Sequence, residues 1–136
     1  EEHILTFHSF AYRILKRIDK KYVKFIEYLI LNLKIFLSEN KPEIIKELYL
    51  LKDIKYIFID EAQDLNKTQY YILKILKKKM KIILYLIGDP NQNIYQFRKS
   101  SDKYLRNHDA KEFTLKINYR SSQDLIDFYK YFQKIN

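Results

Sequence analysis

Residues 56–65 read YIFIDEAQDL, an apolar run that ends abruptly on two adjacent acids, Asp60 and Glu61. A second short apolar run, KIILYLI, occupies residues 81–87. Continuously apolar runs rich in Ile, Tyr and Phe are typical of strands that are covered on both faces of a parallel sheet. We therefore predict two such strands, with the pair of acids at the end of the first.

A helix is predicted between these strands, from about residue 67 to 79. Asn66 is placed to cap its start, Gln69 follows three residues later, and lysines gather at its negative end. A strand, a helix and a second strand in this order form a βαβ unit, which builds a parallel sheet. The sequence therefore predicts an α/β fold.

The segment before this unit is mostly helical by its spacing. HILTF at 3–7 has the content of a short strand, and it runs into a helix whose apolar residues repeat at helical intervals up to Ile18. One long amphipathic helix is expected over 22–37, and Pro42 is placed to open another.

The segment after the unit is predicted to add one strand and one helix. EFTLKI at 112–117 has the content of a short strand. Ser121 and Asp124 then stand at capping-box spacing ahead of an apolar pattern of helical period. This strand would be the fourth in the chain.

Length and composition limit the classes of protein that fit. A chain of 136 residues can bury one core but has no room for two complete domains. It has no apolar run of membrane-spanning length, no signal-peptide pattern and no cysteine for disulfides or thiolate metal sites. We expect an intracellular protein with no membrane partner, cytoplasmic and nucleoid-associated if its source is bacterial.

The charge balance favours an anionic partner. Lys and Arg number 26 against 17 Asp and Glu, and the net charge of +9 favours nucleic acid. The chain is also rich in Ile, Asn and Tyr with a single Gly, a usage that suggests an AT-rich gene in which lysine accumulates by mutation. The lysines of KILKKKMK at 74–81 are therefore either a solvated helix end or a binding patch.

Three polar segments are expected to meet at one edge of the sheet. They are Asp60-Glu61, GDPNQ at 88–92 and NYRSS at 118–122, each following a predicted strand. Ligands collect at the carboxyl ends of parallel strands, where an Asp can hold magnesium through its waters and a neighbouring Glu can polarise the attacking water. Alternatively, the two acids only favour the start of the next turn, by about 0.5 kcal/mol each.

Four strings, in this order, resemble successive motifs of the UvrD/Rep/PcrA-type superfamily 1 DNA helicases. They are TFHSF, FIDEAQDL, LIGDPNQNIYQFR and LKINYRSS, between Thr6 and about Asp124. The resemblance implies a RecA-like parallel sheet flanked by helices, as part of a P-loop NTPase domain. It is weakest over about 16–52, which would be a shortened helical insertion, and about 111–136 would begin the hinge to a second RecA-like domain.

The resemblance implies roles for the residues at the predicted sheet edge. Asp60 would coordinate Mg²⁺, Glu61 would be the catalytic base beside the metal, and Gln92 would sense the γ-phosphate of ATP. Gln63 and Asp64 would complete the signature and couple it to neighbouring motifs. The implied nucleotide-binding residues are Gln63, Gln92, Tyr119 and Arg120, of which Tyr119 would stack on the adenine and Arg120 would reach the γ-phosphate.

The resemblance also implies contacts with single-stranded DNA. Tyr95 and Phe97 point the same way in extended backbone and could stack on unpaired bases, supported by Arg98. Thr6, His8 and Ser9 of the TFHSF string, at the start of the predicted helix, would contact DNA phosphates. Each residue also has a plain structural interpretation, since the aromatic residues could be core, Tyr119 could pack beneath the sheet and Arg120 could be a surface cation.

The sequence departs from the family pattern in two respects. Its single glycine, Gly88, cannot form the glycine-rich loop that cradles phosphates, and the later motifs are missing. Asn93 stands where the family usually has Ser, and Lys99-Ser100 replaces a typical Gly-Ala. We therefore expect an internal part of a helicase motor that is inactive without the remainder of the protein.

The parent protein would couple ATP hydrolysis to movement on single-stranded DNA and to unwinding at junctions of single and double strands. The alternative is a catalytically silent module that binds single-stranded nucleic acid or protein, and a weaker one is a nuclease-coupled member of the superfamily. The sequence leaves the oligomeric state, the polarity and the preference for DNA over RNA open.

Overall fold

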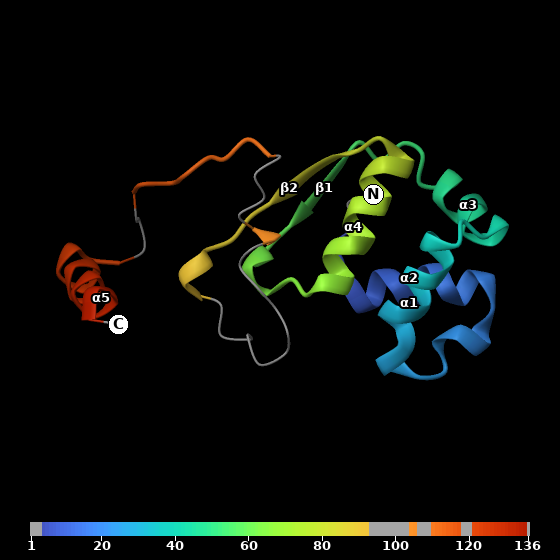
Figure 1. Cartoon of the computed structure of the whole chain (residues 1–136), viewed down its shortest axis with the longest axis horizontal. Helices are drawn as coiled ribbons and strands as arrows, with labels where there is room; N and C mark the ends of the chain where they lie inside the picture. Colours follow the sequence, from blue (N-terminus) through green and yellow to red (C-terminus); the bar gives the residue numbers. More distant parts are fainter. Residues whose placement is uncertain (1–3, 93–103, 106–109, 118–120, 136) are drawn as a thin grey trace.

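The computed structural model describes residues 4–92, 104–105, 110–117 and 121–135. A two-stranded parallel sheet lies beside α4, and α1, α2 and α3 lie on the other side of that helix, whereas α5 stands apart (Figure 1). The bounds are α1 Phe7–Ile18, α2 Leu29–Ser38, α3 Pro42–Tyr49, β1 Tyr56–Ile59, α4 Lys67–Met80, β2 Ile83–Leu86 and α5 Gln123–Ile135. The described part is helix-rich with a small parallel sheet, which is compatible with the predicted α/β class.

The predicted βαβ unit is confirmed. Strands β1 and β2 are parallel, with Tyr56 opposite Ile83 and Ile59 opposite Leu86, and α4 connects them. Asn66 caps α4 by accepting from the Gln69 amide at 2.9 Å, while the Gln69 side chain accepts from the Asn66 amide at 3.1 Å. This reciprocal capping box satisfies two backbone donors at the helix start, so the strand-to-helix turn is fixed locally.

Only one face of the sheet is covered among the described residues. Ile57 and Leu84 pack into a cluster with Leu73 of α4, whereas Phe58 and Tyr85 on the opposite face are 63% and 43% exposed. Their rings stack on each other with centroids 4.8 Å apart. Within the described part of the chain, the prediction that both faces are covered is therefore wrong, because an apolar strand reveals its preference for burial and not the element that buries it.

The three N-terminal helices and α4 share one core. The side chains of Leu15, Leu33, Ile44 and Leu76 come from four different helices and are each at most 1% exposed. At the rim of this core, Arg17 Nε of α1 lies 3.1 Å from Glu47 Oε2 of α3, whose carboxylate is largely buried. The apolar spacing correctly predicted the α1 and α3 helices, and Pro42 occupies the first turn of α3.

The long helix predicted over 22–37 is wrong in its first part. Two 3₁₀ turns, Lys20–Val23 and Ile26–Tyr28, precede α2, and Phe25 between them is extended with φ −122°. Helix α2 then ends at Ser38, and Asn40, two residues later, has a φ of 51° in the left-handed region. The Lys41 amide donates to the Phe36 carbonyl at 3.2 Å and the Asn40 amide to the Leu37 carbonyl at 3.3 Å, which is a Schellman motif with Asn in place of Gly.

Two predicted strands are absent from the described residues. Residues 4–6 have no strand structure, because Thr6 instead caps α1 with its side chain. Residues 112–117 have no ladder partner among the described residues, and Phe113 and Leu115 are 77% and 95% exposed. A strand requires a neighbouring strand, so local content alone did not suffice. No described helix is long and apolar enough to cross a membrane.

Candidate active site

Asp60 and Glu61 follow β1 directly, as predicted, and both are exposed. The Glu61 amide donates to Asp60 Oδ1 at 2.9 Å. Glu61 itself is left-handed, with φ 51° and ψ 43°. This conformation costs a side-chain-bearing residue about 1–2 kcal/mol, and such strained residues cluster at functional sites. This strain could not be predicted from the sequence, because a Glu at this position does not indicate a left-handed backbone as Gly or Asn would.

Gln63 connects the ends of the two strands. Its side chain is 1% exposed, its Nε2 donates to Glu61 Oε2, and its Oε1 accepts from the Asp89 amide at 3.1 Å. The backbone reinforces the connection, since the Ala62 amide donates to the Ile87 carbonyl at 2.8 Å. The carboxylate of Glu61 and the segment after β2 are therefore held to each other through one buried amide.

Gly88 allows this close approach. A Cβ built on Gly88 would lie 2.2 Å from Gln63 Oε1 and 3.0 Å from the Ala62 amide nitrogen. Gln63 could move away only by giving up its hydrogen bonds to Glu61 and Asp89. The glycine is thus required because it has no side chain, a requirement that the sequence alone does not reveal.

Asp89 is a site residue that sequence reasoning missed. Its Oδ1 accepts from the Asn91 amide at 2.9 Å, and its Oδ2 accepts from Gln92 Nε2 at 3.0 Å. The predicted phosphate sensor, Gln92, lies in the short 3₁₀ turn Pro90–Gln92 and is exposed, with its side chain oriented by Asp89. An Asp two residues before a turn amide is a recognisable capping signal that could have identified this role.

Asp64 is the second residue whose environment was not foreseen. Its Oδ1 is shielded from solvent and finds no hydrogen-bond donor among the described residues. Burial raises the pKa of this carboxyl, and the negative charge of Glu61 raises it further. The DEAQD segment therefore holds one exposed pair of acids and one acid with a shielded oxygen.

The residues predicted to meet DNA are described only in part. Thr6 caps α1 by accepting from the Ser9 amide at 3.0 Å, and Thr6, His8 and Ser9 are all exposed. Phe7, between them, packs against the cluster that contains Ile57. Five predicted site residues lie outside the described part of the chain: Tyr95, Phe97, Arg98, Tyr119 and Arg120.

The comparison with protein families matches residues 19–113 to the UvrD/REP helicase N-terminal domain. This chain belongs to that family. The match covers β1, α4, β2 and the polar segments at their ends, so the strand-end cluster lies within the matched region. The resemblance found in the four sequence strings is thereby confirmed.

Several proteins that are similar in sequence to this chain are named as helicases. A protein of Acanthamoeba polyphaga mimivirus, named as a candidate ATP-dependent DNA helicase, is 46% identical over 90% of this chain and 18% of its own length. The RecBCD enzyme subunit RecB of Borreliella burgdorferi is 44% identical over 85% of this chain and 11% of its own length. The ATP-dependent DNA helicase PcrA of Staphylococcus epidermidis is 33% identical over 67% of this chain and 13% of its own length. The chain thus spans less than a fifth of these relatives.

Proposed function

We propose that this chain is part of an ATP-dependent DNA helicase motor and carries its hydrolytic acids at the edge of a RecA-like sheet. The observation that supports this most is the strand-end cluster, in which Glu61 is strained, exposed and held by a buried Gln63. A surface turn would not need a buried amide to orient its carboxylate. The family match and the helicase names of the relatives support the same function for the parent protein.

The acids fit Mg²⁺ by their chemistry. Magnesium keeps several waters and is bound through one or two carboxylates plus substrate phosphates. Asp60 and Glu61 supply two exposed carboxylates, and no described group of three or more His, Cys, Asp or Glu residues forms a complete metal cage. In this proposal Asp60 would hold the ion, and the ion would supply positive charge to the phosphates of ATP.

Within the proposed site, Glu61 accepts the proton of the water that attacks the γ-phosphate. Gln63 fixes the direction of that carboxylate by donating a hydrogen bond from its side-chain Nε2 to Glu61, and Asp89 holds the side chain of Gln92 by accepting a hydrogen bond from its Nε2. Arg120 and Tyr119 would complete the nucleotide contacts. The chain has one glycine and no glycine-rich phosphate loop, so we expect no ATP turnover by the 136-residue chain alone.

The proposed DNA partner is a single strand, with unwinding at junctions of single and double strands. Thr6, His8 and Ser9 at the start of α1 would contact phosphates, and Tyr95, Phe97 and Arg98 would contact bases. The remainder of the motor would supply the phosphate loop and the second RecA-like domain. An intracellular, nucleoid-associated location would follow from this partner.

The test is Glu61→Gln in the full-length parent. We expect nucleotide binding to stay nearly intact and ATP hydrolysis to fall by at least about 100-fold, because the base is removed while the metal ligand Asp60 remains. Glu43→Gln makes the same chemical change at an exposed acid of α3 and should leave hydrolysis unchanged. Hydrolysis at the parental rate in Glu61→Gln would show that the cluster is not catalytic.

A further inference from the structure

The outer side of α4 carries an unusual concentration of positive charge. Between residues 65 and 88 the chain has no acidic residue and six lysines, all of them exposed. Five of these lysines define the lysine face: Lys67, Lys74, Lys77, Lys78 and Lys81. At 100° per residue the four that lie in α4 fall within an arc of about 100°, opposite the buried Ile72 and Leu76, and Lys81 follows as the left-handed C-cap of the helix.

The charge of this face is not neutralised by neighbours. The described ion pairs join Arg17 to Glu47, Lys21 to Asp19 and Lys41 to Glu39, and none of them includes a lysine of α4. The sixth lysine, Lys79, points away from the face and donates to the neutral Asn40 side chain. Lysines three or four positions apart on one helix repel each other, so the face favours a polyanion that would relieve this repulsion.

The helix dipole explains only part of the pattern. Lysines in the last turn are favoured by the negative helix end, which accounts for Lys77 and Lys78. Lys67, however, is the first residue of α4, where the positive helix end disfavours a cation. The lysines of the face therefore occur at both ends of the helix, and one of them lies where the dipole does not favour a cation.

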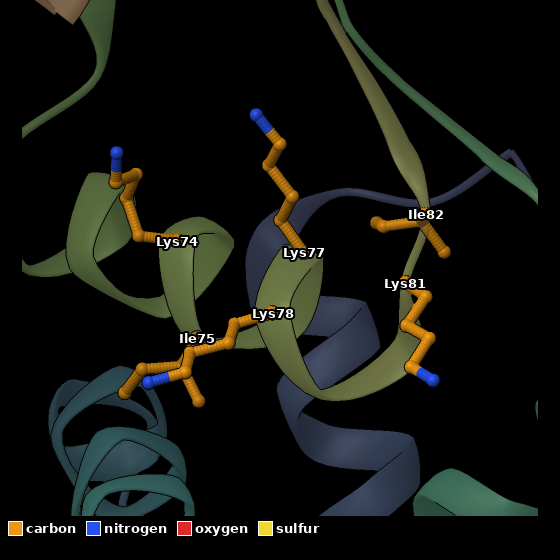
Figure 2. Close-up of a pocket in the computed structure, with 6 residues that line it drawn as sticks. All are labelled: Lys74, Ile75, Lys77, Lys78, Lys81 and Ile82. Carbon is orange, nitrogen blue, oxygen red and sulfur yellow. The ribbon is translucent and has the colours of Figure 1, made fainter.

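The arrangement suits an extended anion better than a small one. Lys74, Lys77, Lys78 and Lys81 line an open hollow of about 600 Å³ together with Ile75 and Ile82. Figure 2 shows Lys74 and Lys77 extending to one side of the helix, whereas Lys78 and Lys81 extend in other directions. The ammonium groups thus spread along the helix and do not converge on one point.

The face lacks the aromatic platforms that single-strand binding uses. Its two aromatic neighbours are engaged within the chain: Tyr70 stacks on Tyr104 with ring centroids 4.6 Å apart, and the Tyr71 ring lies under the Lys34 ammonium, 5.3 Å from the ring centroid. Proteins that hold single strands combine cations with rings on which bases stack. Lysines without such rings contact only the phosphate backbone. Duplex DNA carries twice as many phosphates per unit length of its axis as one of its strands.

We propose that the lysine face is a second nucleic-acid contact that binds the phosphate backbone of duplex DNA. The inference rests on the proposed function in that it takes DNA as the partner, but it concerns a helix surface and not the strand-end cluster. The proposal gives a role to the lysines of KILKKKMK at 74–81. These lysines take no part in the proposed hydrolytic site.

The experiment compares the 136-residue chain with two charge-matched variants. One replaces Lys74, Lys77, Lys78 and Lys81 with Gln, and the other replaces four exposed lysines elsewhere, Lys16, Lys20, Lys24 and Lys46. Binding to a labelled duplex of about 20 base pairs is measured by fluorescence anisotropy between about 50 and 200 mM salt. A single strand of the same length and a polyglutamate peptide serve as competing probes.

We expect the first variant to lose at least about tenfold in duplex affinity at about 100 mM salt, and its salt slope to fall by about 2 to 4. The control variant should lose less than about threefold, although its net charge is the same. Replacing the same four residues of the face with Arg should restore binding, which separates charge from any effect on folding.

Equal losses in both variants, or no duplex binding at about 50 mM salt, would overturn the proposal, since non-specific binding is strongest there. So would tighter binding of polyglutamate or of the single strand through the same lysines. These outcomes leave the hydrolytic site untouched, because Glu61→Gln in the parent tests it separately. Conversely, normal hydrolysis by Glu61→Gln would not affect the lysine face.

Discussion

Gly88→Ala is the most informative single change, because it places one methyl group against the link between the two strand ends. The new Cβ would lie 2.2 Å from Gln63 Oε1, which no real pair of such atoms tolerates. The backbone cannot retreat easily, since the Ala62 and Gln63 amide nitrogens lie only 3.0 and 3.1 Å from the same point. Gln63 must therefore leave its position.

The expected cost follows from these contacts. Forcing a group into a filled site costs about 1–3 kcal/mol, and leaving a buried amide unpaired costs about 1–3 kcal/mol more. Ala restricts the unfolded chain more than Gly does, which offsets about 0.4–1 kcal/mol. We expect a net loss of about 2–4 kcal/mol in the free energy of unfolding, or roughly 6–16 °C in Tm for a chain of this size.

The assay is urea unfolding of the chain followed by circular dichroism, with Gln63→Ala as the matched background. Without the Gln63 amide the main clash disappears, so Gly88→Ala should then cost only about 1 kcal/mol or less. The two changes should thus couple by about 1–3 kcal/mol in a double-mutant cycle. An equal cost in both backgrounds, or a stabilising Gly88→Ala, would refute the proposed packing of Gly88 on Gln63.

Two other predictions concern neighbouring parts of the βαβ unit. Asn66→Ala removes the capping box of α4 and should lower the free energy of unfolding by about 1 kcal/mol, measurable as a shift of the urea midpoint, whereas Asn66→Asp should retain most of the cap. Because the pKa of Asp64 is raised in the folded chain, the folded state holds this proton to higher pH than the unfolded state, and stability is lost as pH rises through the folded pKa. Asp64→Asn should therefore show a flatter decline in stability above about pH 4, and an unchanged pH profile would contradict the raised pKa.

The parts of the fold that the sequence predicted are those with local causes. The capping box of Asn66 and Gln69, the apolar strands and Pro42 at the start of α3 each act within a few residues, so the βαβ unit and α3 could be predicted. The wrong predictions depended on distant partners or competing local structure. Residues 112–117 have no neighbouring strand to pair with in the described part of the chain, and Phe25 interrupts an otherwise helical spacing.

The candidate site divides in the same way. The positions of Asp60, Glu61 and Gln92 at the strand ends followed from the parallel order of the strands. The left-handed Glu61 and the contact of Gly88 with Gln63 depend on two segments separated by more than twenty residues in the chain. No periodicity or propensity encodes such a contact, so only the folded arrangement reveals it.

The buried side-chain amide of Gln63 links the segment after β1 to the segment after β2, so that the two segments should move together. Because its two polar groups bond to Glu61 and Asp89, either residue can shift only if the other follows or if a hydrogen bond to the buried Gln63 amide breaks. Breaking it would cost about 1–3 kcal/mol for each buried group left unpaired. A shift of the Glu61 carboxylate should therefore also shift the GDPNQ segment. The short turn that carries Gln92 belongs to this segment and would move with it.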